Sequence, residues 1–211
     1  MTPERDDVVS LDLGAGQLVL GEWLRVQQPR AVVLALHDTA ADLDTLRPFA
    51  RQLSRLTIST LMLDLPGHGL SGGTWHEHGE HAVSGALREC ARTGLPVSIL
   101  AVGASAQLAL GQPEPTVSLV AVSPSLSVEN LNDAEAWRTT PLLTIIDSTD
   151  GRGAEVQAAL GRWSRGWYVR MNGHYRSGGA IDTGWVPQIT HAAAAFAAEQ
   201  FAYHSAKQPR S

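Results

Sequence analysis

The stretch that decides the fold is Ile99-Leu100-Ala101-Val102-Gly103-Ala104-Ser105-Ala106-Gln107. Its apolar start is typical of a buried strand and leads into Gly103, which can adopt backbone angles that a side chain would forbid. Ser105 follows two residues later, and an Ala/Leu-rich segment leads away. Strand, tight turn and helix start are the surroundings that an exposed nucleophilic serine needs. Such a turn also lets the backbone N–H of Ala106 face a developing oxyanion.

The composition is that of one globular domain. The chain has 211 residues, of which 44% are hydrophobic and 18% charged, and this length allows a sizeable core. The formal net charge is -5 and no long basic run occurs, so neither nucleic acid nor an anionic membrane surface is an expected partner. We expect one domain over residues 1–203 and a flexible C-terminal tail over residues 204–211.

Cysteine content and the N-terminal sequence favour the cytoplasm. Cys90 is the only cysteine, so no internal disulfide can form and a reducing compartment is expected. We interpret it as a small core residue of a helix. Residues 1–7 are polar and acidic and lack the apolar core of a signal peptide. No apolar run approaches the ~20 residues that span a membrane.

Apolar strands alternate with amphipathic helices along the chain. Residues 8–13 and 18–26 alternate apolar and polar side chains, which predicts an N-terminal antiparallel hairpin. A continuous apolar run predicts a buried strand over 31–36, largely apolar stretches predict further strands over 58–63, 97–102, 117–122 and 142–146, and a last strand is expected over 167–171. Helical spacing predicts helices that include 43–56, 83–91, 155–163 and 189–203. This order predicts an α/β fold, with a mostly parallel central sheet and helices on both faces.

Polar side chains are concentrated where the predicted strands end. In parallel sheets, ligands bind beyond the carboxyl ends of the strands. Those ends carry His37-Asp38-Thr39, Asp64, Ser105, Ser123, Asp150 and His174. The sequence therefore predicts an active site at this edge of the sheet.

These residues give the chain a resemblance to the α/β-hydrolase fold superfamily over nearly its whole length. The stretch Asp64-Leu65-Pro66-Gly67-His68-Gly69-Leu70-Ser71 matches the D-x-P-G-H-G-x-S loop of that superfamily. Ser105 falls where its G-x-S-x-G nucleophile elbow belongs. Asp150 matches the position of its acid, and His174 that of its late histidine. The order Ser, Asp, His along the chain is the one that this fold uses.

The resemblance implies a serine hydrolase that cleaves ester or thioester bonds of a small substrate, without metal or cofactor. His174 would take the proton of Ser105, and Asp150 would orient the imidazole. The N–H groups of Thr39 and Ala106 would form the oxyanion hole. A serine nucleophile speaks against haloalkane or epoxide chemistry, which in this fold resembles attack by an aspartate. Residues 124–140 leave room for little more than a loop, so the cap is minimal or absent.

Three features depart from the pattern of this superfamily. Gln107 stands where glycine is usual, and its amide would reach toward the oxyanion or block the pocket. Asp38 replaces a common glycine after His37, which places a carboxylate near the oxyanion loop, where it would oppose an oxyanion. We take His37, Asp38 and Gln107 as candidate substrate contacts. The helix after Ser105 is also shorter than usual.

Several alternatives stay open. Asp147 could replace Asp150 as the acid, and His191 could replace His174 as the base. His76, His78 and His81 could bind zinc, but they are better interpreted as the solvated start of a helix. The site could also transfer its acyl group to an acceptor other than water, or the chain could be a non-catalytic binding protein. The oligomeric state is not predicted.

Overall fold

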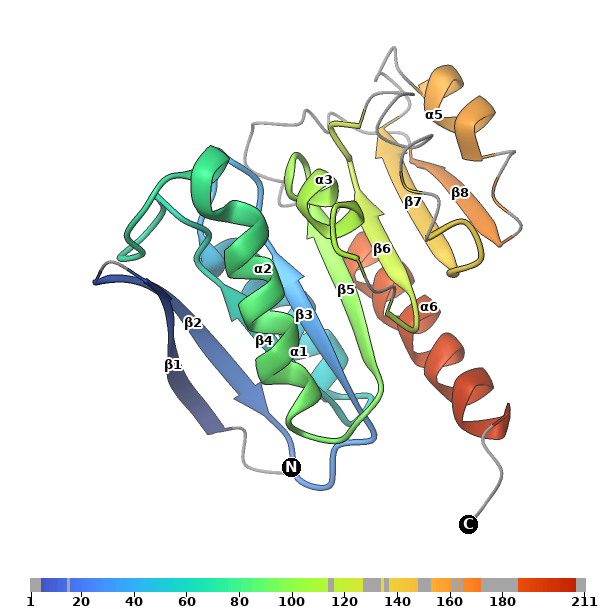
Figure 1. Cartoon of the computed structure of the whole chain (residues 1–211). Coiled ribbons are helices and arrows are strands. Elements are labelled where there is room, and N and C mark those ends of the chain that lie inside the picture. The colour runs from blue at the N-terminus through green and yellow to red at the C-terminus, as the bar shows by residue number, and fades with distance from the viewer. Residues whose placement is uncertain are drawn as a thin grey trace.

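The protein folds around an eight-stranded sheet with the strand order β1-β2-β4-β3-β5-β6-β7-β8 (Figure 1). The computed structural model describes residues 5–14, 16–113, 116–126, 134, 137–147, 153–160, 163, 165–171 and 186–207. The strands are β1 (Arg5–Gly14), β2 (Gln17–Arg25), β3 (Ala31–Leu36), β4 (Ile58–Leu63), β5 (Val97–Val102), β6 (Leu119–Val122), β7 (Leu142–Asp147) and β8 (Gly166–Met171).

The pairing of the strands confirms the predicted sheet. β1 and β2 form the antiparallel hairpin, and β2 also runs antiparallel to β4. All pairs from β4-β3 to β7-β8 are parallel. β3, β4 and β6 are buried along their whole length, as expected for strands that are covered on both faces.

Helices cover both faces of this sheet, as predicted. The helices are the 3-10 turn η1 (Leu43–Leu46), α1 (Arg47–Ser54), α2 (Trp75–Ala91), α3 (Ser105–Leu110), α5 (Gly153–Leu160) and α6 (Val186–Lys207). Figure 1 shows α2 and α3 in front of the sheet, and α1 and α6 behind it. The helix expected to end at residue 203 continues to Lys207.

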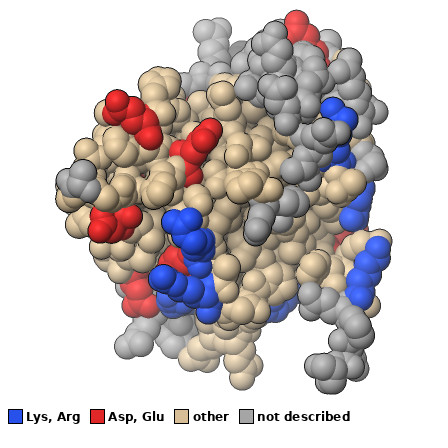
Figure 2. All heavy atoms as spheres, in the orientation of Figure 1, with Lys and Arg blue, Asp and Glu red and all other residues tan. Residues whose placement is uncertain are grey.

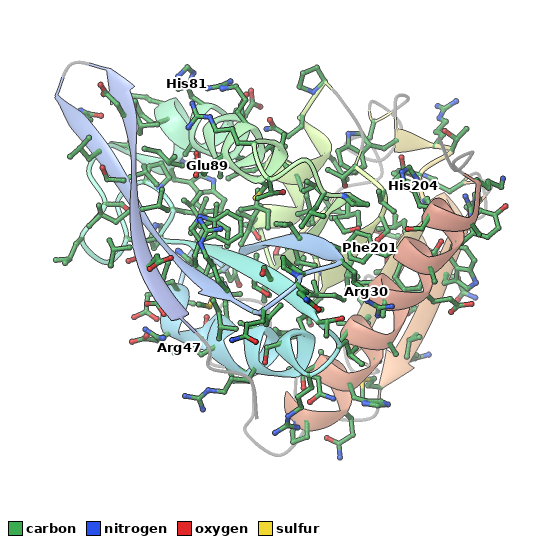
Figure 3. The ribbon with its side chains drawn as sticks, turned by 90° about the horizontal axis from the view of Figure 1, so that it is seen from below. Arg30, Arg47, His81, Glu89, Phe201 and His204 are labelled. Carbon is green, nitrogen blue, oxygen red and sulfur yellow. The ribbon has the colours of Figure 1, made fainter. Side chains whose placement is uncertain are left out.

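Two apolar layers, one on each face, hold the helices to the sheet. On β3, Val32 and Leu34 pack toward the layer that contains α2 and α3, whereas Val33 packs toward the layer of α1 and α6. Cys90 lies in the first layer and is fully buried, as predicted, and burial raises the pKa of its thiol. Figure 3 shows Phe201 on the side of α6 that faces the sheet.

Charged side chains form separate groups on the surface. Figure 2 shows acidic groups mainly on the side of the β1-β2 hairpin, and basic groups near the centre and the right edge of the same face. Among the described residues, no helix has both the length and the apolar character that crossing a membrane would require.

Candidate active site

The loops after β3 and β5 lie side by side at one edge of the sheet. β3 and β5 are parallel neighbours, and Leu36 pairs with Ala101 near the ends of the two strands. The chain therefore brings residues 37–39 next to residues 103–105. This is the edge at which the sequence predicts the active site.

Gly103, rather than Ser105, forms the apex of the turn after β5. Its φ of +63° lies in the left-handed region, and its N–H donates to the Val122 carbonyl at 2.9 Å. A Cβ atom built on Gly103 would overlap all three atoms of the Asp38 carboxyl group. Glycine is thus required here both by the backbone and by the neighbouring carboxylate.

Backbone N–H groups from both loops hold the Asp38 carboxylate. Its Oδ1 atom accepts from the N–H of Thr39 at 2.8 Å and from the N–H of Ala104 at 3.0 Å. The Thr39 hydroxyl lies 3.4 Å from the same oxygen. Two converging N–H groups are the donors that would stabilise an oxyanion. Here they bind a carboxylate of the chain itself, and Asp38 remains 8% exposed.

The position of Ser105 corrects the prediction that it is an exposed nucleophile. Ser105 begins α3 and is fully buried. Its Oγ atom accepts from the Val102 N–H at 3.0 Å and faces the carbonyls of Val102 at 2.9 Å and of Leu36 at 3.2 Å. The hydroxyl therefore ties the end of β5 to β3, and in this arrangement it is not available to attack a substrate.

The neighbours of Ser105 also differ from their predicted roles. The buried N–H of Ala106 points toward the Gly103 carbonyl at 3.4 Å, so the N–H that converges with that of Thr39 belongs to Ala104 and not to Ala106. Thr39 does contribute a donor at this place, but the donor serves Asp38. Gln107 is exposed and does not fill the turn.

His37 is a buried structural residue, which corrects its expected contact with substrate. Its Nε2 atom accepts from the Leu65 N–H at 2.9 Å, so Nδ1 carries the proton and donates to the Asp38 carbonyl at 2.7 Å. Burial is the largest cause that lowers the pKa of His37 below 6.5, and the nearby His68 lowers it further. The neutral ring connects the β3 loop to the loop after β4.

The loop over residues 64–71 supports the site from the other side. His68 has its Nε2 atom 2.8 Å from the Thr39 carbonyl and its Nδ1 atom 3.1 Å from the Pro66 carbonyl. The Asp64 Oδ1 atom accepts from the Leu43 N–H at 2.9 Å. Ser71 donates to the Asp64 carbonyl at 2.7 Å. Of these residues, His68 contacts the Thr39 segment directly.

The other predicted catalytic residues, Asp150 and His174, lie outside the described residues. β7 and β8 end at Asp147 and Met171, at the same edge of the sheet as β3 and β5. The alternative base His191 lies exposed on α6, with the Gln52 side chain 3.3 Å from its Nδ1 atom.

The three histidines of α2 do not form a metal site within the described part of the chain. His76 and His81 are exposed, and Figure 3 shows His81 on the outer side of the helix. The half-buried His78 uses its Nδ1 atom to accept from the Thr74 N–H at 3.2 Å. No group of three possible metal ligands occurs among the described residues.

Solved structures with the same architecture identify the fold. A protein named DcsB, solved in complex with a substrate analogue, superposes with a TM-score of 0.78 at 12% identity, covering 94% of this chain and all of that one. A dienelactone hydrolase from Anabaena variabilis gives a TM-score of 0.69 at 16% identity, with 95% and 98% of the two chains covered. The chain has the α/β-hydrolase fold. An esterase domain from Rhodothermus marinus gives a TM-score of 0.69 at 15% identity, over 92% and 99% of the chains.

Sequence similarity adds nothing to this assignment. No model of a protein family matches the sequence, and no curated protein matches it. At these identities the likeness to esterases and hydrolases shows the fold alone.

The apex of the turn after β5 is Gly103, two residues before the predicted apex, Ser105. β5 ends at Val102, one residue before the left-handed Gly103, so the apex of the turn comes directly after the strand. The strand predicted over 97–102 also ends directly before Gly103, which indicates Gly103 as the apex. The motif indicates Ser105 instead, because Gly103-Ala104-Ser105 also fits the start of the G-x-S-x-G pattern.

Proposed function

We propose that this protein is a hydrolase of small molecules in which the Asp38 carboxylate holds the reacting position that a serine would hold. The observation that carries the proposal is the location of this carboxylate. It lies against Gly103 at the apex of the elbow, where two backbone N–H groups converge on its Oδ1 atom. A carboxylate can act as a nucleophile or as a base, so the site keeps a group that can start a hydrolytic reaction.

Asp150 and His174 complete the proposed site. Both follow strands that end at the same edge as β3 and β5. An imidazole at this edge would take a proton from water, and a carboxylate beside it would hold the required tautomer. The acyl-enzyme on Ser105 is not part of the proposal, because Ser105 is buried and its hydroxyl is engaged.

The structural neighbours support a hydrolase with a small substrate. They include proteins described as a dienelactone hydrolase and as esterases. A fold can lose or change its chemistry while its architecture persists. The class of bond that this site cleaves must therefore follow from its own residues.

A second candidate function is ligand binding without catalysis. It is favoured by the same turn, because glycine stands at the apex and the donors of the oxyanion hole are already occupied. In that case Asp38 would only close the hole. The two candidates differ in whether the protein turns over a substrate at a rate that depends on the Asp38 charge.

Turnover by matched variants tests the proposal. Purified wild type, Asp38→Asn and Asp44→Asn are compared on 4-nitrophenyl esters, lactones, terminal epoxides and primary alkyl halides. Asp44 is the control, because it is an exposed carboxylate of the neighbouring turn that pairs with Arg47 at 2.7 Å. We expect Asp38→Asn to lower the rate on at least one substrate about 100-fold or more, and Asp44→Asn to leave it unchanged. Equal rates for all three proteins would refute the proposal, and no turnover of any substrate would favour ligand binding.

A further inference from the structure

We infer that a groove beside the second half of α2 binds a small hydroxy acid, a molecule that carries a carboxylate and a hydroxyl group on an apolar body. The groove has a volume of about 480 Å³. It is separate from the candidate active site. Val97, which lines the groove, is the first residue of β5, whereas Gly103 follows the last residue of that strand, so the two places lie at opposite ends of β5.

The groove exists because α3 is short. This helix ends at Leu110, and its Leu108 side chain lies directly against Gly79 in the first half of α2. Figure 1 shows α3 beside the start of α2 only. The face of α2 that carries Ser84, Leu87 and Ala91 is therefore left open, and it forms one wall of the groove.

Apolar side chains form much of the lining. Leu87 and Ala91 lie one turn apart on α2, Val97 begins β5, and Val117 lies just before β6. Leu87 and Val97 pack against the core layer of α2 and α3 but stay only half-buried. Apolar surface is thus exposed inside the groove, and an apolar ligand body that covered it would remove it from water.

Arg88 supplies a positive charge that no carboxylate of the described residues neutralises. It is exposed and lines the groove, and its Nη1 atom donates to the Ser84 hydroxyl at 2.9 Å. By contrast, Arg92 on the next turn of α2 pairs with Glu89 at 2.6 Å. A guanidinium group binds carboxylates through paired, charge-assisted hydrogen bonds. The contact with Ser84 uses one end of this group and leaves its other N–H donors for an anion.

Gln112 supplies a fixed hydrogen-bond acceptor. Only 4% of this residue is exposed, and its Nε2 atom donates to the Leu108 carbonyl at 3.0 Å, which holds the amide in place. Its Oε1 atom accepts from no described residue, yet it is not one of the enclosed polar atoms that lack a partner. The oxygen therefore reaches the surface, and the groove is the surface that Gln112 lines.

Together these features select the class of ligand. A volume of about 480 Å³ lies within the range of roughly 300–1,000 Å³ that is usual for small-molecule sites. Arg88 selects a carboxylate, and the Gln112 oxygen selects a hydroxyl group that donates to it. A hydrocarbon would leave both groups unmatched, and a simple fatty acid would leave the oxygen without a donor.

Isothermal titration calorimetry with 8-hydroxyoctanoate tests this inference. Wild type is compared with Arg88→Gln, and with Arg92→Gln, which removes the same charge one turn along α2 and outside the groove. Ala91→Trp fills the groove from an exposed helix position. Urea unfolding checks that each variant is folded. We expect Arg88→Gln to weaken binding about 10-fold or more, Ala91→Trp to abolish it, and Arg92→Gln to leave it within about 2-fold of wild type.

Two related probes test the two polar contacts separately. Octanoate lacks the hydroxyl group and should bind wild type about 3-fold more weakly, and 1,8-octanediol lacks the carboxylate and should bind about 10-fold more weakly or less. Equal affinity of octanoate would overturn the contact with Gln112, and equal affinity of the diol would overturn the contact with Arg88.

The inference as a whole would be overturned by either of two results. One is that 8-hydroxyoctanoate does not bind the wild type. The other is binding that Ala91→Trp does not weaken, or that Arg88→Gln weakens no more than Arg92→Gln, because the acid would then lie elsewhere on the protein. Neither result bears on turnover at Asp38, so the proposed function is tested independently.

Discussion

The carboxylate of Asp38 lies in the space that a side chain on Gly103 would occupy. The two residues come from different loops, after β3 and after β5, and they are in direct contact. Gly103 leaves room for the carboxylate, and the N–H of the next residue, Ala104, helps to hold it. The carboxylate at this elbow therefore comes from the neighbouring loop and not from the turn itself.

The first prediction concerns the fit between these two residues. Gly103→Ala should destabilise the protein more than Gly94→Ala. Both glycines have left-handed φ values, +63° and +70°, and the conformational cost of alanine there is about 1 kcal/mol. A Cβ at Gly94 would meet nothing within 4 Å, whereas at Gly103 it would overlap Asp38. Urea unfolding measures the difference.

Removing the carboxylate provides the control for this comparison. In an Asp38→Gly background, the cost of Gly103→Ala should fall to that of Gly94→Ala, since only the backbone cost remains. If the excess cost persisted without Asp38, the overlap between the two residues would not be its cause.

The second prediction is a gain of reactivity. The double variant Asp38→Gly/Gly103→Ser removes the carboxylate from the N–H groups of Thr39 and Ala104 and places a hydroxyl at the apex. With His174 and Asp150 in their proposed positions, it should acquire hydrolysis of 4-nitrophenyl acetate above the background of Gly103→Ser alone. Equal rates for the double and the single variant would argue against an oxyanion hole made by these two N–H groups.

The fold was predictable from the sequence because it depends on patterns that many residues share. Strands 31–36 and 58–63 were predicted with their observed bounds, since wholly or largely apolar stretches of this length fit positions that are buried on both faces. The loop over 64–71 correctly indicated the fold, and its His68 side chain contacts the Thr39 carbonyl.

The site was harder to predict because the apex of the turn lies two residues before Ser105, and because the carboxylate beside it comes from another loop. The match of Gly103-Ala104-Ser105 to the start of G-x-S-x-G favours Ser105 as the apex, whereas the end of the predicted strand at residue 102 favours Gly103. That choice follows from where β5 ends relative to β6, where the Gly103 N–H donates to Val122. The sequence did indicate an unusual carboxylate, because Asp38 stands where glycine is common after His37. The backbone geometry was needed to show that the N–H groups of Thr39 and Ala104 bind this carboxylate.

The third prediction separates the structural role of Ser105 from a catalytic one. Ser105→Ala leaves the Val102 N–H without the acceptor that it has at 3.0 Å, so it should lower the free energy of unfolding by about 1–3 kcal/mol. Turnover per folded molecule should not change. Ser84→Ala is the control, because Ser84 is half-buried and its hydroxyl accepts from the exposed Arg88 side chain. A loss of turnover at full stability would restore Ser105 as a nucleophile.

The fourth prediction concerns pH. Burial lowers the pKa of His37 below its unfolded value of 6.5, so below that pH the unfolded chain binds a proton that the folded chain does not. The free energy of unfolding should therefore fall as the pH drops through about 6.5, by at most about 1.4 kcal/mol per pH unit from this residue. Protonation would also remove the acceptor of the Leu65 N–H.

Urea unfolding across this pH range, with two variants, measures the contribution of His37. His37→Gln keeps an oxygen that can accept from Leu65 and should flatten the pH dependence. His191→Gln, which changes an exposed histidine of α6, should retain the slope of the wild type. Identical slopes in wild type and His37→Gln would show that His37 is not the group that titrates.

The most direct test of whether the elbow chemistry lies at Asp38 or at Ser105 is the site of fluorophosphonate labelling. A fluorophosphonate reacts with a serine hydroxyl that is exposed and activated by a base. Folded wild-type protein is incubated with the reagent, digested and analysed by mass spectrometry. The geometry predicts no adduct on Ser105, whose hydroxyl is buried between Val102 and Leu36. An adduct on Ser105 in the folded protein would contradict it.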